Sequence, residues 1–194
     1  MIDRLLMKAG RLGYGGAEFL AGIPGTVGGG IKGNAGAFGR SFAEIIDEIT
    51  IINQRIMEQD LYNNDIGFAY RSSKLKNGTI IISAKIRFRR GRQKDIMAII
   101  KRNLKYRSQR QPAGYSAGSF FKNPSPYSAG KLIEECGLKG LRVGDAEVSM
   151  KHANFIINRG KAKASDVIKL AKRIQKIVRN KKGILLKQEV KTLS

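Results

Sequence analysis

Cysteine, tryptophan and histidine are almost absent from this sequence, which contains one cysteine, no tryptophan and one histidine in 194 residues. Because Cys136 is alone, an internal disulfide is excluded and a reducing compartment is favoured. The lone His152 cannot supply the ligand set of a zinc site, so we expect no metal. The sequence also lacks an apolar run of about 18 residues and the apolar core of a signal peptide. These absences predict a protein of the cytoplasm with no membrane segment.

Acidic residues are scarce as well. There are 15 Asp and Glu against 37 Lys and Arg, for a net charge of +22. Such a charge attracts nucleic acid, anionic lipid and phosphorylated substrates. The cations are spread along the chain, however, and neither zinc-finger spacing nor an RNA-recognition motif accompanies them. Two function classes stay open at this point: an enzyme with a solvated basic surface, and a nucleic-acid or anionic-surface binding module.

Glycine is the residue that the sequence concentrates most. Residues 22–39 hold eight of the 23 glycines, which suits positive φ angles or close approach of a ligand to the main chain. Pro24 fixes one φ angle, and Thr26 adds a small hydroxyl. Clustered amides of this kind can form a nest for a phosphate or diphosphate. A flexible surface loop is the alternative, but interleaved apolar residues such as Ile23 and Val27 are untypical of linkers.

Apolar spacing and turn residues predict an α+β fold. Helical spacing predicts helices over residues 1–14, 94–107, 128–136 and 165–180, with Ser165 as the N-cap of the last. Runs of β-branched residues predict strands over 42–52, 146–149, 153–158 and 184–190, and a buried strand over 79–88 after the Asn77-Gly78 turn. A charge run at residues 89–92 predicts a boundary between two domains, residues 1–92 and 93–194.

Five sequence blocks resemble one enzyme family. Residues 18–29 together with 34–39 resemble the UDP-N-acetylenolpyruvoylglucosamine reductases, flavoenzymes of peptidoglycan synthesis. Four further blocks follow in family order: Tyr-Arg-Ser-Ser at 70–73, Ala-Gly-Ser-Phe-Phe-Lys-Asn-Pro at 117–124, residues 137–140 continuing to 148–156, and Gln-Glu-Val at 188–190. Their order over residues 15–191 favours the enzyme over the binding module, because charge alone does not produce ordered motifs.

The resemblance implies a fold, a reaction and its cofactors. It makes residues 1–92 the latter half of an FAD-binding domain and residues 93–194 a substrate-binding domain. NADPH would reduce FAD, which would reduce UDP-N-acetylglucosamine enolpyruvate to UDP-N-acetylmuramate. That reaction serves cell-wall biogenesis, and with it cell shape, the cell cycle and cell division. The resemblance further implies a monomer with no specific nucleic-acid or membrane partner.

The resemblance also implies roles for particular residues. Arg71 and Glu189 match residues that stabilise the substrate enediolate, and Ser119 matches the proton donor. The implied FAD-binding residues are Gly22, Ile23, Pro24, Gly25, Thr26, Val27, Gly28 and Gly29. The implied substrate contacts are Lys122, Asn123 and His152.

Each catalytic assignment is chemically reasonable but has a plainer alternative. The fixed donors of the Arg71 guanidinium suit a carboxylate that gains charge, although an arginine in a loop is usually an ion-pair partner. Glu189 beside that anion would need a raised pKa, whereas a glutamate near a C-terminus is usually solvated. Ser119 needs neighbours such as Lys122 to act as an acid, and would otherwise be a turn residue. His152 would ordinarily be structural.

The sequence departs from the family pattern in two places. The family begins with a further N-terminal segment that carries half of the flavin site, and Lys191 stands where the family usually has arginine. The short connection between Arg71 and Ser119 indicates the shorter subclass. We therefore expect the 194-residue chain alone to bind FAD weakly, to be catalytically impaired, and to leave an apolar sheet edge of its first part exposed.

Overall fold

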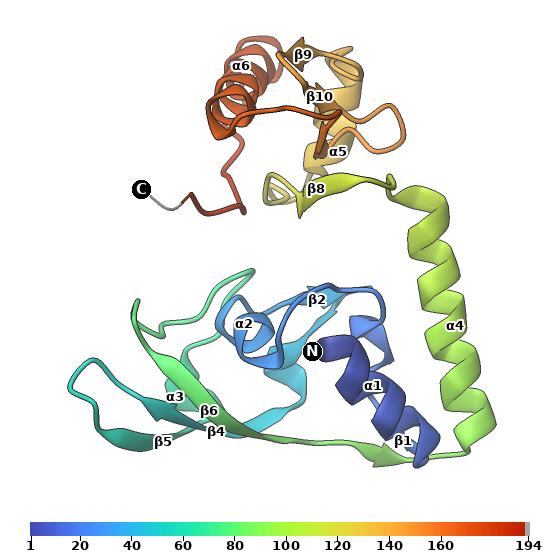
Figure 1. Ribbon diagram of the computed structural model, residues 1–194, viewed down its shortest axis with the longest axis vertical. Coiled ribbons are helices and arrows are strands. Elements are labelled where there is room, and N and C mark those ends of the chain that lie inside the picture. The colour runs from blue at the N-terminus through green and yellow to red at the C-terminus, as the bar shows by residue number, and fades with distance from the viewer. Residues whose placement is uncertain (193–194) are drawn as a thin grey trace. The chain divides into compact units, whose positions relative to one another are not determined.

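The computed structural model describes residues 1–192, and its chain divides into a first unit, Met1–Arg107, and a second unit that begins at Ser108. Helices and strands occur in both, which confirms the predicted α+β class (Figure 1). In chain order the first unit contains α1 (Ile2–Arg11), β1 (Tyr14–Gly15), the 3-10 helix η1 (Glu18–Leu20), α2 (Val27–Lys32), β2 (Gly36–Ala37), β3 (Arg40–Ser41), η2 (Phe42–Glu44), β4 (Ile46–Ile52), β5 (Glu58–Tyr62), α3 (Asn63–Ile66), β6 (Ile80–Ile86), β7 (Arg89–Arg90) and most of α4 (Gln93–Arg110).

The main sheet of the first unit has the antiparallel order β5-β4-β6. Alternation along β4 gives the sheet two different faces: Ile49 and Ile51 are buried, while Thr50 donates a hydrogen bond to Asp60 Oδ1 at 2.7 Å on the other face. The buried face packs into a core with α1, η1, α2 and η2, whose fully buried members include Ile31 and Phe42. The sequence therefore builds a core in this unit from its own residues.

The strand predicted over residues 79–88 is present as β6, but it is not buried. Ile80 and Ile82 are 60% and 51% exposed. The reason is that successive side chains of β6 point to opposite faces: Ile81, Ala84 and Ile86 pack against the core, whereas Ile80 and Ile82 lie on the other face of this edge strand. This edge carries the exposed apolar residues that the sequence predicts for the first part of the chain.

Helix α4 extends the first unit beyond the boundary predicted at residue 92. Ile96 and Ile100 are buried in the first core, and Asn103 Nδ2 donates to the Glu18 carbonyl at 2.8 Å. Gly10 of α1 permits close packing here, because a β-carbon at Gly10 would lie 3.0 Å from Ile100 Cδ1. These contacts explain why the compact unit extends to Arg107.

The second unit is a four-stranded antiparallel sheet with two helices. Its strand order is β8-β11-β10-β9, formed by β8 (Tyr115–Ser119), β9 (Arg142–Val143), β10 (Ala146–Val148) and β11 (Phe155–Asn158), and its helices are α5 (Ala129–Glu135) and α6 (Ala164–Lys182). The predicted pairing of strands near 146–149 and 153–158 is confirmed. One face of α6 is fully buried in the core through Leu170, Ala171, Ile174 and Val178.

Two local predictions in the second unit are wrong. Helix α6 begins at Ala164 rather than at a Ser165 cap, because Asp166 Oδ2 accepts the Lys163 N–H at 2.9 Å and satisfies the first turn. The predicted strand over residues 184–190 is reduced to one bridge between Gln188 and Phe121. No helix within residues 1–192 has the length and apolar character needed to cross a membrane.

Candidate functional site

The second half of the glycine-rich segment holds the turn that carries Arg71. The buried Asn34 donates from Nδ2 to the Ala69 carbonyl at 2.9 Å and accepts the Ala43 N–H on Oδ1 at 3.0 Å. Ser73 Oγ donates to the Lys32 carbonyl at 2.8 Å. Both ends of the Arg71 turn are thereby fixed to residues 32–34.

Arg71 itself has a strained backbone. Its φ angle is +53°, a left-handed conformation that costs an arginine roughly 1 kcal/mol. The guanidinium compensates through a hydrogen bond from Nη2 to the Gly36 carbonyl at 2.7 Å, and its Cζ lies 5.3 Å from the Tyr70 ring centroid. Gly36 cannot be larger, since a β-carbon there would lie 2.0 Å from the Arg40 carbonyl oxygen. Strain that is held in this way is common at functional sites.

The first half of the segment, the predicted FAD-binding run 22–29, is a shaped and accessible loop that continues into the first turn of α2. Thr26 caps α2, because its Oγ1 accepts the Gly29 N–H at 3.0 Å. The Gly25 carbonyl accepts the Ile2 N–H at 3.0 Å, which fixes the loop to α1. At Gly25 the φ angle is +130°, and a β-carbon would have no heavy atom within 4 Å. The main chain at this point is open to a ligand, and the residues present fit a phosphate group.

Arg107, at the end of the first unit, lies against the start of this loop, and no sequence motif marks it. Its Nε donates to the Gly22 carbonyl at 3.3 Å, and its side chain is half-buried. Burial, and then the neighbouring charge of Arg71, lower the pKa of Arg107, while the charge of Asp3 acts weakly in the opposite direction. The first unit therefore places two guanidinium groups along one glycine-rich segment.

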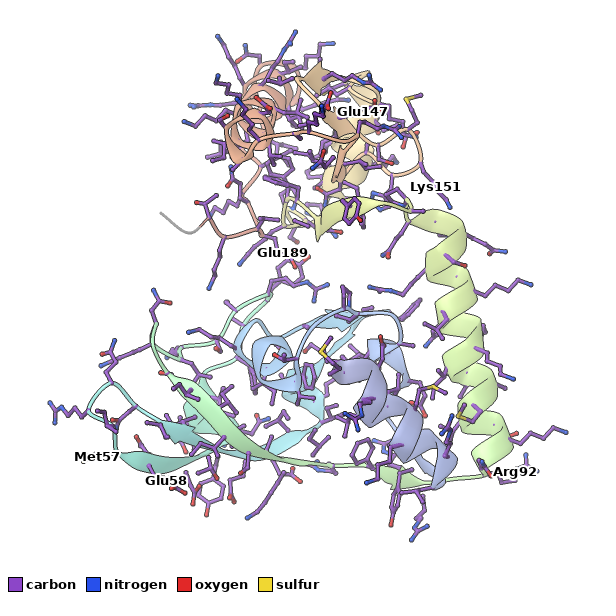
Figure 2. All side chains as sticks on the ribbon, in the orientation of Figure 1. Met57, Glu58, Arg92, Glu147, Lys151 and Glu189 are labelled. Carbon is purple, nitrogen blue, oxygen red and sulfur yellow. The ribbon has the colours of Figure 1, made fainter. Side chains whose placement is uncertain are left out.

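In the second unit, the segment after β8 brings Ser119 and Glu189 to neighbouring backbone positions. Ser119 ends β8 opposite Phe155 of β11. The next residue, Phe120, accepts the Glu189 N–H on its carbonyl oxygen at 2.9 Å. Glu189 lies on the segment that follows α6 and is labelled in Figure 2. Arg71 belongs to the first unit, so the predicted catalytic residues are divided between the two units.

A buried amide side chain fixes the Ser119 segment. Asn154, 4% exposed, donates from Nδ2 to the Phe121 carbonyl at 2.8 Å and accepts the Phe121 N–H on Oδ1 at 2.9 Å. Its own carbonyl accepts the Phe120 N–H at 2.7 Å. In the sequence, Asn154 belongs to one of the family blocks but has no predicted role. The feature that could have identified it is an amide side chain, with one donor group and one acceptor, among apolar residues.

The predicted substrate contacts surround the same segment. Asn123 Oδ1 accepts the Ala129 N–H at 3.0 Å, so part of its function is to cap α5. Lys122 donates its backbone N–H to the Lys187 carbonyl at 2.8 Å. His152 packs edge-on against Phe155, with ring centroids 4.9 Å apart.

The surroundings of His152 favour its neutral form over its cation. Its Nδ1 accepts the Asn154 N–H at 3.2 Å, which places the ring proton on Nε2. Burial lowers the pKa of His152 below its ordinary value, and Lys139 acts in the same direction. At neutral pH the residue can therefore donate one hydrogen bond to a substrate without contributing charge.

A cavity of about 330 Å³ lies elsewhere in the first unit, between the β4–β5 hairpin and residues 74–79. Its lining includes Ile51, Met57 and Leu75 and none of the predicted site residues. Within residues 1–192 no group of three or more His, Cys, Asp or Glu could hold a metal ion.

Comparisons with known proteins agree on one family. The family model described as the C-terminal domain of UDP-N-acetylenolpyruvoylglucosamine reductase matches residues 110–193. Over 98% of its length the chain is 43% identical to UDP-N-acetylenolpyruvoylglucosamine reductase 2 of Symbiobacterium thermophilum and 42% identical to the Prochlorococcus marinus reductase.

The same relationship holds for a solved structure. The crystal structure of the Thermus caldophilus reductase superposes with a TM-score of 0.88 at 36% identity, covering 98% of this chain and 68% of that one. The chain spans 62% and 66% of the length of the Symbiobacterium and Prochlorococcus relatives, which is less than two thirds.

Proposed function

The chain belongs to the UDP-N-acetylenolpyruvoylglucosamine reductase family, and we propose that it takes part in the FAD-dependent, NADPH-using reduction of UDP-N-acetylglucosamine enolpyruvate to UDP-N-acetylmuramate. This reaction supplies a peptidoglycan precursor in the cytoplasm. The observation that carries the proposal is the hydrogen bond of 2.9 Å from Glu189 N–H to the Phe120 carbonyl, because it brings two predicted catalytic positions from distant parts of the chain together.

Residues 22–29 are the part of this chain that would hold the FAD diphosphate. The loop is fixed at Gly25 and Thr26, its main chain is approachable, and no bulky side chain stands at Gly25. When bound, FAD would supply hydride from NADPH to the enolpyruvyl double bond.

Three side chains carry the remaining chemistry in this proposal. Arg71, held at a fixed position by the Gly36 carbonyl, stabilises the substrate carboxylate as it gains negative charge. Glu189 hydrogen-bonds to the same developing enediolate. Ser119 donates the proton to the neighbouring carbon, and its backbone is fixed by the strand pair β8–β11.

Lys122, Asn123 and His152 bind the sugar nucleotide. The Lys122 ammonium supplies charge for the substrate diphosphate. Because Asn123 Oδ1 accepts the Ala129 N–H, its Nδ2 group is the one that donates a hydrogen bond to the substrate. His152 contributes an Nε2 hydrogen bond without charge.

The chain matches 68% of the Thermus caldophilus chain, so the test of the proposal compares the 194 residues alone with the same residues supplied with the unmatched N-terminal segment of a relative.

Visible absorbance and NADPH oxidation test the proposal. The 194-residue chain, alone and with the unmatched segment as a second polypeptide, is mixed with FAD and desalted. We expect a flavin band and substrate-dependent NADPH oxidation when the segment is present. A flavin-loaded protein that leaves NADPH unoxidised in the presence of substrate would contradict the reductase function.

One surface favours the second candidate function, a binder of nucleic acid or anionic surfaces. The exposed face of α6 carries five cations that form no ion pair with any residue in 1–192: Lys169, Lys172, Arg173, Lys176 and Arg179. A titration with duplex DNA across salt concentrations tests this function. Counterion-driven adhesion should fall steeply as salt rises, whereas retained affinity at moderate salt would favour the binding module.

A further inference from the structure

Arg107 presents an energetic problem that the fold does not resolve. Its guanidinium is half-buried, and among residues 1–192 it forms one hydrogen bond, to the Gly22 carbonyl at 3.3 Å, and no ion pair. A partly buried charge without a counter-ion is costly, because desolvation is not offset by a Coulombic partner. An arginine cannot relieve this cost by deprotonating, since a guanidinium stays protonated in proteins.

The charged neighbours of Arg107 increase this cost. The charge of Arg71 disfavours the protonated form of Arg107, and the exposed Asp3 offsets that effect only in part. The conformation of Arg71 is itself unfavourable, with a φ angle of +53°. The half-buried charge of Arg107 and the strained backbone of Arg71 thus both cost folding free energy, and both residues contact the segment 22–36. Such costs are typical of residues that are retained for function.

The position of Arg107 indicates the ligand. A β-carbon on Gly22 would lie 3.2 Å from Arg107 Cδ, so the side chain lies directly against the main chain where the accessible loop begins. A guanidinium presents a planar fork of donors that binds phosphate oxygens in pairs. Approachable main chain and a positive potential from two arginines both suit a group that carries more than one negative charge.

We propose that Arg107 is an anion-binding residue whose ligand is the diphosphate of a nucleotide bound against residues 22–29. The proposal rests on the proposed function for the class of ligand, since both FAD and the sugar nucleotide contain a diphosphate. The sequence motif identifies the loop at residues 22–29 mainly through its glycines. The proposal adds to that loop a charged binding residue, Arg107, that comes from α4.

The test uses inorganic pyrophosphate as the probe and the full 194-residue chain, by calorimetric titration at low salt. Arg107→Met is compared with Arg102→Met, a matched control, because Arg102 is an exposed arginine on the same helix. We expect the wild-type chain and Arg102→Met to bind pyrophosphate alike, and Arg107→Met to bind at least tenfold more weakly. Equal binding by Arg107→Met, or equal weakening in both variants, would overturn the proposal.

Thermal unfolding without ligand supplies an independent readout. Because substitution removes an uncompensated charge, Arg107→Met should melt at the same temperature as the wild type or higher. A clearly lower melting temperature would make Arg107 a structural residue and would overturn the proposal. Binding is compared at a temperature where far-ultraviolet circular dichroism shows each variant folded.

Titration with ADP and with UDP distinguishes the two sources of the diphosphate. Tighter binding of ADP, lost in Arg107→Met, assigns the site to the flavin nucleotide; tighter binding of UDP, lost in the same variant, assigns it to the substrate. Neither measurement needs catalysis. Failure of the reductase function would therefore leave the pyrophosphate, ADP and UDP results interpretable, and failure of the Arg107 proposal would not affect the reductase test, which measures NADPH oxidation by the unsubstituted protein.

Discussion

The two units hold their site residues in different ways. In the first unit Arg71 sits on a turn with a strained backbone, fixed to a glycine-rich segment through Asn34 and Gly36. In the second unit Ser119 ends a regular strand, and the buried Asn154 fixes the residues that follow it. The first site depends on local conformations that cost free energy, whereas the second continues a sheet that is favourable by itself. Substitutions should therefore separate the two units by their effects on stability.

The largest effect is expected at Gly36. In Gly36→Ala the new β-carbon would lie 2.0 Å from the Arg40 carbonyl oxygen, a backbone atom that cannot rotate away. We expect a loss of about 3 kcal/mol in the free energy of unfolding of the first unit, the upper range for overpacking. Urea denaturation measures it, with Gly39→Ala as the control, because a β-carbon there would contact nothing within 4 Å and only its φ angle of +76° would cost the alanine about 1 kcal/mol. Equal losses in both variants would show that the backbone at Gly36 relaxes and that the close contact with the Arg40 carbonyl costs no more than the positive φ angle at Gly39.

The equivalent test of the second unit is Asn154→Ala. This change leaves the buried N–H and carbonyl of Phe121 without their side-chain partner. Each unsatisfied group costs about 1–3 kcal/mol, so we expect a loss of about 2 kcal/mol confined to the second unit. Asn180→Ala on the exposed end of α6 is the control and should change stability by less than about 0.5 kcal/mol. If Asn154→Ala unfolds both units equally, the two sites are not independently supported.

A smaller difference should measure the strain at Arg71. Arg71→Ala and Arg71→Gly both remove the bond to the Gly36 carbonyl, but only glycine accepts a φ angle of +53° without penalty. The glycine variant should therefore be more stable than the alanine variant by about 1 kcal/mol. Chemical denaturation of the two variants side by side measures this difference. Equal stability would mean that the turn relaxes when the guanidinium is removed.

The same contrast explains which features could be predicted from the sequence. The second unit follows periodic rules, so the pairing of β10 with β11 and the buried stripe of α6 were predictable. The failures concern places where tertiary contacts override a local pattern. The run Ile80-Ile81-Ile82 reads as buried, but β6 is an edge strand, and residues 184–190 read as a strand but form one bridge.

For the candidate site, ordered motifs identified the family but not the supports of its residues. Asn34 and Asn154 act through side-chain bonds to backbone groups distant in sequence, and no spacing rule predicts such bonds. Arg107 lies 85 residues from the Gly22 carbonyl that it contacts. In a chain with 37 lysines and arginines, the sequence does not distinguish Arg107 from the other cations. Its partial burial in the structure does.

The smallest predicted effect is the dependence of the second unit on pH through His152. Burial holds the pKa of this residue below its ordinary value of 6.5, so the unfolded chain binds the proton more readily than the folded one. The stability of the second unit should therefore be constant above about pH 6.5 and decrease as the pH falls below the unfolded value toward the folded one.

The measurement is simple because His152 is the only histidine of the chain. Its proton NMR titration should give a pKa below 6.5, and thermal unfolding between pH 7.5 and 5 should show the loss of stability. In His152→Gln that loss should shrink, whereas the first unit, which contains no histidine, should behave alike in both proteins. A normal pKa for His152 would mean that its ring is solvated and free to carry charge, which would replace the neutral hydrogen-bond donor of the proposed substrate site with a cation. The pH dependence thus tests whether burial fixes the state of His152 in the second unit. The corresponding feature of the first unit is the strained backbone of Arg71.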